Sequence, residues 1–215
     1  MQTSFFAQAS LALKSRPLSP EGRKIPASVL IPLFYDSKEG KIKVMLTQRA
    51  LDLDRQPGDF CFPGGQAEKG EAPQDTALRE TFEETGIPKS AVSILGHTDF
   101  IVSAFGAFIM PYVAIVDEEA VKNLKLSRDE VEKAIFVPLE FFMAATPEKY
   151  TIEMKYNFPP DFPFEKIYGG KDYQWRKALM DEYFYEYNGD VIWGMTARMI
   201  KNLCDILKSD GISLN

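Results

Sequence analysis

The stretch from Phe62 to Ile87 constrains this 215-residue chain more than any other part of the sequence. It reads FPGGQAEKGEAPQDTALRETFEETGI, and its densest part places three glutamates within five positions, at Glu80, Glu83 and Glu84. Residues three and four apart share one face of an α-helix, so these carboxylates would converge and repel one another. Open water or a bound cation would relieve that repulsion, and which of the two applies is the functional question.

The flanks of this cluster predict a loop, a helix and a second loop. Gly64 and Gly65 come first, and a double glycine permits a tight turn whose backbone carbonyl oxygens are not covered by side chains. Pro73 suits the first turn of a helix, and Gly86 followed by Pro88 suits its end. Taken alone, an E-x-x-E-E string favours a solvated acidic helix face over a cation site.

The spacing of the charged residues across positions 65–87 matches a known signature. With Glu71 and Arg79 in place beside the three glutamates, the segment resembles the Nudix box, G-x5-E-x7-R-E-U-x-E-E-x-G-U, where U is bulky and apolar. Thr81 is the one departure from the pattern. The resemblance implies an α/β (α+β) fold, an α/β/α sandwich on a mixed β-sheet with a loop-helix-loop box. It also implies hydrolysis of a nucleoside diphosphate linked to another group.

The resemblance further implies a metal site. Glu80, Glu83 and Glu84 would bind divalent ions, together with the backbone carbonyl of Gly64 or Gly65, and Glu83 and Glu84 are also catalytic candidates. Ligands that are all oxygen atoms favour Mg²⁺ or Mn²⁺ over zinc. Such ions would polarise the phosphoryl oxygens and lower the pKa of the attacking water.

Arg79 and Glu130 complete the set of catalytic candidates. Arg79 is expected to orient carboxylates, Glu71 among them, through bidentate hydrogen bonds. Glu130 lies in an acidic stretch that resembles the corresponding part of related enzymes, where a glutamate completes the metal site or acts as the base. Glu132 is the second candidate for that role. An exposed acidic loop explains the same charge run equally well.

The segment immediately before the box indicates a substrate. Residues 45–65 resemble the extra motif of the coenzyme A diphosphatases, L-L-T-x-R-[SA]-x3-R-x3-G-x3-F-P-G-G, and PGDFCFPGG is similar to the peroxisomal members. Met45 replaces the first leucine, and Asp54 occupies the place of the second arginine, with Arg55 one position later. Arg49 and Arg55 are the candidates for binding substrate phosphates, because the planar guanidinium fork suits phosphate. Coenzyme A would yield 3′,5′-ADP and 4′-phosphopantetheine.

Two other functions stay open. One is a Nudix hydrolase of ADP-ribose or a dinucleotide, which the displaced Arg55 keeps in play. The other is a nucleotide-sensing module without turnover, since fold does not fix function. Every glutamate of the box is present and no basic helix-turn-helix is visible, so the enzyme is preferred.

Composition limits the partners and the location. A net charge of −6 argues against nonspecific nucleic-acid binding, which relies on clustered lysine and arginine. The sequence contains no run of about 18 apolar residues, so it does not predict a membrane span. Cys61 and Cys204 lie too far apart for a zinc motif or a disulfide framework, so a reducing cytoplasm is expected. We therefore expect a small nucleotide of the coenzyme A type as partner, without nucleic acid or membrane.

The chain divides into two expected parts. Residues 1–26 predict a helix (Ser4–Lys14) and a proline-containing connector, and residues 27–215 predict a single Nudix domain. A homodimer in which the N-terminal helix packs on a partner chain is left open. Strands are expected at residues 27–35, 41–49, 94–103 and 108–116, with a loop or short helix at 117–128 and a C-terminal helix from Ile192 to Gly211. The resemblance does not place residues 147–171.

Overall fold

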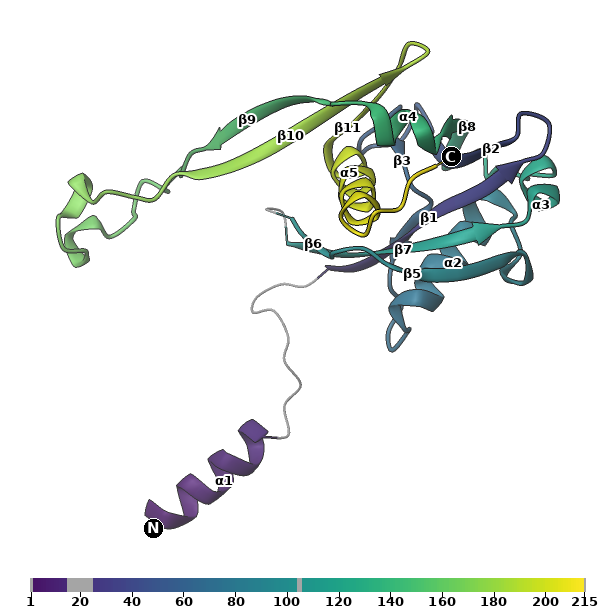
Figure 1. The fold of residues 1–215 in the computed structure, drawn as a ribbon. Helices are drawn as coiled ribbons and strands as arrows, with labels where there is room; N and C mark the ends of the chain where they lie inside the picture. Colours follow the sequence, from purple (N-terminus) through teal and green to yellow (C-terminus); the bar gives the residue numbers. More distant parts are fainter. Residues whose placement is uncertain (1, 15–24, 104–105, 215) are drawn as a thin grey trace.

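The computed structural model describes residues 2–14, 25–103 and 106–214 (Figure 1). Its α-helices are α1 (Gln2–Lys14), α2 (Pro73–Thr85), α3 (Glu118–Lys122), α4 (Leu139–Ala144) and α5 (Gly194–Ser209). Its strands are β1 (Ile25–Asp36), β2 (Lys41–Arg49), β3 (Phe60–Cys61), β4 (Gly64–Gln66), β5 (Val92–His97), β6 (Ile101–Val102), β7 (Ala107–Val116), β8 (Val131–Pro138), β9 (Glu148–Met154), β10 (Ala178–Tyr187) and β11 (Asp190–Trp193). Three short 3-10 helices are η1 (Lys89–Ala91), η2 (Phe164–Lys166) and η3 (Gly170–Asp172).

A mixed sheet forms the centre of the molecule, and its two faces are covered by different helices (Figure 1). The strand order is β3-β2-β1-β7-β5, with β4 on β1, β6 on β7 and β8 on β2. The β1–β7 pair is parallel and the other pairs are antiparallel. Neighbouring residues of β1 point to opposite faces: Leu30 packs with Ala77 of α2, and Ile31 belongs to the cluster that contains Ile200 of α5. The expected sandwich on a mixed sheet is confirmed.

Strand β1 starts two residues before the expected position. The parallel register with β7 begins at Ile25 opposite Ala107, so the ladder extends the strand into the predicted connector. Proline has no backbone N–H to pair, so Pro26 fits near the start of the strand. Its carbonyl accepts a hydrogen bond from the Ala67 N–H at 3.0 Å. The rest of the connector, residues 15–24, lies outside the described residues.

The expected strand at residues 94–103 is divided in two. Strand β5 ends at His97, and β6 resumes at Ile101, both pairing with β7. The register shifts between Ile94 and Gly96, which is an irregularity that residue type alone does not predict. His97 packs edge-on against Tyr112, with ring centroids 6.4 Å apart, as a structural histidine would.

The C-terminal helix begins later than predicted, at Gly194. Residues Asp190–Trp193 form β11 instead, because the preceding Asn188-Gly189 pair makes the two-residue turn of a hairpin with β10. Both turn residues have positive φ, 53° and 86°, which asparagine and glycine tolerate best.

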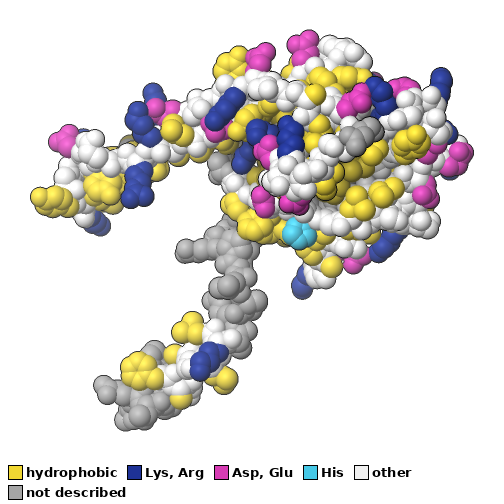
Figure 2. Space-filling model, in the orientation of Figure 1, with side chains coloured by type: hydrophobic (Ala, Val, Ile, Leu, Met, Phe, Trp, Pro, Cys, Tyr) yellow, Lys and Arg dark blue, Asp and Glu magenta, His cyan; other side chains and the backbone are white. Residues whose placement is uncertain are grey.

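Residues 148–187 form an arm that leaves the main sheet (Figure 1). Strand β9 pairs along its full length with residues 178–184 of β10, in a second sheet of order β11-β10-β9. Figure 2 shows apolar and charged side chains distributed along this arm. A cluster of aromatic rings closes its tip, comprising Tyr156, Phe158, Phe162, Phe164, Tyr173 and Trp175.

Candidate active site

Helix α2 carries the glutamate cluster, and local signals fix both of its ends. Pro73 occupies the first turn, and Gly86 caps the last turn with φ 74° while its N–H donates to the Phe82 carbonyl at 2.8 Å. Thr81, the departure from the box pattern, is fully buried. Its hydroxyl donates to the Ala77 carbonyl at 2.7 Å, so the polar group is satisfied inside the helix.

Arg79 binds three carboxylates and one backbone carbonyl. Its Nε and Nη2 donate to the two oxygens of Glu71 at 2.9 and 3.0 Å, which is the bidentate contact expected from the sequence. Its Nη1 donates to Glu80 and Glu83, both at 2.9 Å, and Nη2 also donates to the Gln66 carbonyl at 3.1 Å. These contacts use all five guanidinium donors, and Arg79 holds the pKa of Glu71 down at about 2. Arg79 therefore fixes carboxylates and has no donor left for a ligand.

The glycine pair forms a strand rather than the expected tight turn. Gly64 and Gly65 belong to β4, which pairs with Val29 and Ser28 of β1. Gly64 has φ 155°, and a Cβ there would lie 2.4 Å from the Ser28 carbonyl oxygen. A Cβ on Gly65 would lie 2.4 Å from Cδ of Glu80. Only glycine allows the backbone to approach both the neighbouring strand and the helix carboxylate this closely.

A cavity of about 200 Å³ lies beside these carboxylates. Strand β2, the β3–β4 segment, helix α2 and the start of β8 all contribute to it. It brings together five residues singled out in the sequence, namely Arg49, Gly64, Glu80, Glu84 and Glu130. The other lining residues are Thr47, Leu53, Cys61 and Val131.

Glu84 is the most strongly perturbed acid in this cavity. Its side chain is buried, with the residue only 7% exposed, and its Oε2 has no hydrogen-bond partner. Burial raises the pKa of Glu84 to about 8, and the negative charges of Glu130 and Glu80 add to the rise. The Gly64 N–H, 3.3 Å from Oε1, and the positive charge of Arg49 act in the opposite direction. Burial is also the main cause that raises the pKa of Glu80.

The donor set of this cavity fits a hard divalent cation. Within residues 2–14, 25–103 and 106–214, no three ligating side chains already stand in metal-binding geometry. Arg79 holds one oxygen of Glu80, whereas the buried Oε2 of Glu84 has no partner and would be satisfied by a cation. The candidate donors are oxygens, as Mg²⁺ and Mn²⁺ prefer. Burial raises the pKa of the Cys61 thiol to about 11, which keeps it a neutral, poor ligand.

Besides Arg79, four candidate residues from the sequence lie outside the cavity lining. Glu83 has a side chain that is 50% exposed and hydrogen-bonded to Arg79. Gly65 stands against Glu80. Glu132 and Arg55 are exposed. Arg55 contributes only its backbone here, since its carbonyl oxygen accepts from Nε and Nη2 of Arg49 at 3.3 and 3.2 Å.

Sequence reasoning did not assign roles to Thr47, Leu53 and Val131. Strand alternation offers a signal for Thr47, because it lies two positions from Arg49 and so on the same face of β2. Its hydroxyl lies 3.4 Å from the Cys61 Sγ and 3.3 Å from the Cys61 carbonyl oxygen. Leu53 lies between strands, where no periodicity indicates the direction of its side chain.

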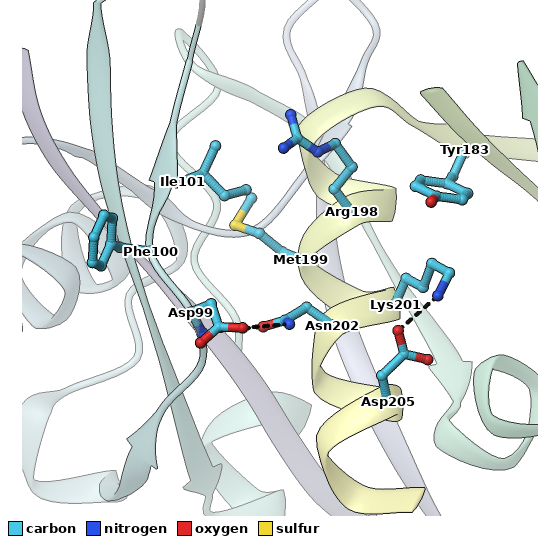
Figure 3. A pocket seen from close by; sticks show the side chains of 9 residues that line it. All are labelled: Asp99, Phe100, Ile101, Tyr183, Arg198, Met199, Lys201, Asn202 and Asp205. Atoms are coloured by element: carbon cyan, nitrogen blue, oxygen red, sulfur yellow. Dashed lines mark hydrogen bonds and ion pairs between the residues drawn. The ribbon is translucent and has the colours of Figure 1, made fainter. Parts of the chain in front are cut away.

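A second cavity, of about 250 Å³, lies between α5, β10 and residues 99–101 (Figure 3). Its two carboxylates are bonded to their neighbours. Asp205 pairs with Lys201 at 2.6 Å, and Asp99 accepts from the Asn202 amide at 2.9 Å (Figure 3). Unlike Glu84, neither has an unpartnered buried oxygen, so the box cavity is the better candidate for an active site.

This chain is similar to known proteins of one family. A family model described as NUDIX domain matches residues 24–158. Nudix hydrolase 3 of Caenorhabditis elegans is 30% identical over 187 residues, covering 85% of this chain and 73% of that protein. A MutT/nudix family protein from Enterococcus faecalis shares the fold, with a TM-score of 0.52 at 17% identity over 94% of this chain and 69% of that one.

Two further relatives carry a more specific name. The peroxisomal coenzyme A diphosphatase ndx-8 of Caenorhabditis elegans is 37% identical, covering 63% of this chain and 58% of that protein. The peroxisomal coenzyme A diphosphatase NUDT7 of Mus musculus is 36% identical, covering 54% of this chain and 48% of that protein. The alignments thus span about half the length of these two relatives.

This chain belongs to the NUDIX family, and it is a Nudix hydrolase of the kind that acts on nucleoside diphosphate derivatives. None of the helices among the described residues is both long enough and apolar enough to cross a membrane.

Proposed function

We propose that this protein is a metal-dependent coenzyme A diphosphatase, which hydrolyses coenzyme A or a derivative to 3′,5′-ADP and 4′-phosphopantetheine. The observation that carries the proposal is the position of Arg49. It lines the same cavity as Glu80, Glu84 and Glu130, so the motif upstream of the box borders the acidic site directly. Two relatives named as coenzyme A diphosphatases support the same substrate.

The reaction joins water to one phosphorus and breaks the bond from that phosphorus to the bridging oxygen. Mg²⁺ or Mn²⁺ at this site would supply charge neutralisation and acidify water. Glu80, Glu84 and the Gly64 carbonyl would hold the cation, with Glu83 as a further candidate ligand. Glu130 lines the cavity from the residues just before β8 and not from α2. It would accept the proton from the attacking water.

Arg49 is suited to hold the substrate diphosphate. Its guanidinium lies close enough to Glu84 to lower the pKa of that acid, and Nε and Nη2 bind the Arg55 carbonyl. These bonds place the guanidinium between the acidic site and the loop after β2. Positioning by such a planar fork supplies much of the rate in phosphoryl transfer, where the protein does little covalent chemistry.

A second substrate class is favoured by the exposure of Arg55. Coenzyme A carries a 3′-phosphate in addition to its diphosphate, and Arg49 is the one arginine that lines this cavity among the described residues. ADP-ribose and dinucleotides with no 3′-phosphate would need fewer cations. If Arg55 does not bind phosphate, these substrates become the better match.

Product analysis separates these possibilities. Purified protein is incubated with Mg²⁺ or Mn²⁺ and, in parallel, coenzyme A, ADP-ribose, NADH and a diadenosine polyphosphate. We expect 3′,5′-ADP from coenzyme A at the highest kcat/KM, no product with EDTA, and no product from Glu84→Gln. Glu186→Gln serves as the matched control, because it removes an exposed carboxylate of β10 that does not line the cavity. Preference for another diphosphate would reject the coenzyme A assignment, and binding without cleavage would indicate a nucleotide sensor.

The arginine roles need a second comparison. Arg49→Lys keeps the charge and loses the fork, so we expect a rise in KM for coenzyme A of about tenfold or more. Arg55→Ala tests the exposed arginine. A rise in KM for coenzyme A but not for coenzyme A lacking its 3′-phosphate would assign Arg55 to that phosphate. If Arg55→Ala has the kinetics of the wild type for both substrates, Arg55 is not part of the site.

Imaging of the tagged full chain tests the proposed cytoplasmic location against the peroxisome named for the two relatives.

A further inference from the structure

Among the described residues, no strand pairs with the outer edge of β9. β9 is the last strand in the order β11-β10-β9, and no other strand among residues 25–103 and 106–214 pairs with it. Six of its seven residues are exposed. Pairing with β10 runs without a register shift from Glu148 opposite Phe184 to Met154 opposite Ala178. Proteins protect such an edge with a bulge, a proline, a very short strand or charged side chains, because its free N–H and C=O groups can pair with another chain. The charged side chains of β9 are of both signs.

The sequence of β9, EKYTIEM, is complementary to itself in the antiparallel direction. When two copies are aligned about Thr151, Lys149 stands opposite the partner's Glu153, and Tyr150 stands opposite the partner's Ile152. The first pair combines opposite charges on one face of the sheet. The second combines an aromatic and a β-branched side chain on the other face. Both are favourable cross-strand pairs, and the two-fold axis makes each pair occur twice.

Other registers lose this complementarity. An axis through Tyr150 would place Lys149 opposite Thr151 and Glu153 opposite Pro147, so both opposite-charge pairs would be lost. An axis through Ile152 would place Lys149 opposite Lys155, which repel each other. The opposite-charge pairs therefore favour the axis at Thr151 over these two registers.

The charges on the neighbouring strand continue the pattern. Lys149 already pairs with Asp181 at 2.8 Å, and Glu153 pairs with Lys177 at 3.1 Å. Across two chains the charges would therefore alternate in sign, from Asp181 to Lys149 to the partner's Glu153 and the partner's Lys177. On the apolar face, Tyr150 and Ile152 are 58% and 46% exposed in the single chain, and pairing would cover both.

We propose that the β9 edge binds a second copy of this chain and forms one continuous six-stranded sheet with its two-fold axis at Thr151. The apolar and charged pairs together select a second copy over an unrelated strand. The outer part of the arm is a two-stranded ribbon, which is marginally stable by itself, so added strands also stabilise the arm. This dimer does not depend on the substrate of the active site.

Charge reversal provides the test. Lys149→Glu alone places a second carboxylate opposite the partner's Glu153, and Glu153→Lys alone places two ammonium groups opposite each other. Sedimentation equilibrium of the full chain should show a dimer for the wild type. We expect each single variant to dimerise at least about tenfold more weakly, because two attractive pairs become repulsive.

Mixing distinguishes contacts between chains from contacts within a chain. In a 1:1 mixture of the two single variants, every heterodimer has an acidic side chain opposite a basic one at both contacts between positions 149 and 153, so dimerisation should return. The double variant should dimerise as well, although it has lost the ion pairs with Asp181 and Lys177. A wild type that is monomeric at about 0.1 mM would overturn the proposal. So would single variants with unchanged affinity, or a mixture that stays monomeric.

A cysteine at the axis tests the register. Thr151→Cys should form an intermolecular disulfide on mild oxidation, since the axis brings residue 151 beside its own copy. Tyr168→Cys, at a position that is 98% exposed near the tip of the arm, is the matched control and should not cross-link. The native Cys61 and Cys204 are half-buried and buried, so the wild type should give no background. Equal cross-linking of both variants would reject the axis at Thr151.

Discussion

Replacing Glu84 by glutamine in the metal-free protein should remove the pH dependence of stability that this acid imposes. The pKa of Glu84 rises from 4.5 to about 8 on folding, chiefly because its carboxylate is buried. The folded state therefore favours the protonated acid. The stability that Glu84 contributes is fully present below about pH 4.5 and is lost as the pH rises toward 8, because Glu84 ionises at lower pH in the unfolded chain than in the folded protein.

The expected magnitude follows from these two pKa values. For a group with a pKa of 4.5 in the unfolded chain and about 8 in the folded protein, the free energy of unfolding falls by about 2.5 kcal/mol as the pH rises from 5 to 7. The glutamine side chain of the variant keeps an oxygen to accept from the Gly64 N–H and does not ionise. The free energy of unfolding of the wild type should thus fall by about that amount relative to Glu84→Gln over this range.

Urea unfolding in EDTA at pH 5, 6 and 7, followed by far-UV circular dichroism, measures this difference. Glu132→Gln is the control, since it removes an exposed carboxylate and should track the wild type. Adding Mn²⁺ at about 100 times its Kd should restore about 2.7 kcal/mol to the wild type and little to Glu84→Gln. A difference between wild type and Glu84→Gln that stays constant or grows in favour of the wild type as the pH rises would refute the reasoning.

Three further predictions concern neighbouring residues. Arg79→Lys should lower the free energy of unfolding by about 1–3 kcal/mol in urea titrations, because lysine cannot reproduce the bidentate contact to Glu71; unchanged stability would contradict that role. Gly65→Ala should raise the Mn²⁺ concentration for half-maximal hydrolysis by about tenfold or more, because the added Cβ displaces the Glu80 carboxylate. Gly96→Ala is the control: its Cβ would lie in open space, so the required Mn²⁺ concentration should stay unchanged. Cys61 should resist iodoacetamide at pH 8 in the folded protein, since burial raises its pKa to about 11, and rapid alkylation by mass spectrometry would count against this.

Local signals in the sequence predicted the box helix well. Pro73 and Gly86 define its ends, and the spacing of Arg79 and Glu71 predicted their bidentate contact. These features depend on residues that are close in the chain. The metal-binding and catalytic roles remain predictions, and Glu83 stays a candidate although it lies outside the cavity lining.

Features that depend on distant parts of the chain could not be predicted. Gly64 forms a strand because β1 passes within van der Waals distance, and that neighbour lies more than thirty residues earlier. Arg49 binds the Arg55 carbonyl, and the Arg55 side chain is exposed, neither of which the motif spacing indicates. The arm was missed because β9 and β10 are separated by residues 155–177, and the polar pattern of β9 gives no sign of which strand it pairs with.

The aromatic cluster at the tip of the arm has a consequence for folding. Its rings contact one another, with Phe158 and Trp175 centred 4.9 Å apart, and none of them belongs to the buried clusters around the main sheet. The contacts that stabilise the tip are therefore independent of the buried contacts that stabilise the main sheet. The tip should open as its own cooperative unit, with amide hydrogens that exchange long before those of β1 and α2. Replacing residues 155–177 by a short turn should leave the core's protection from exchange intact.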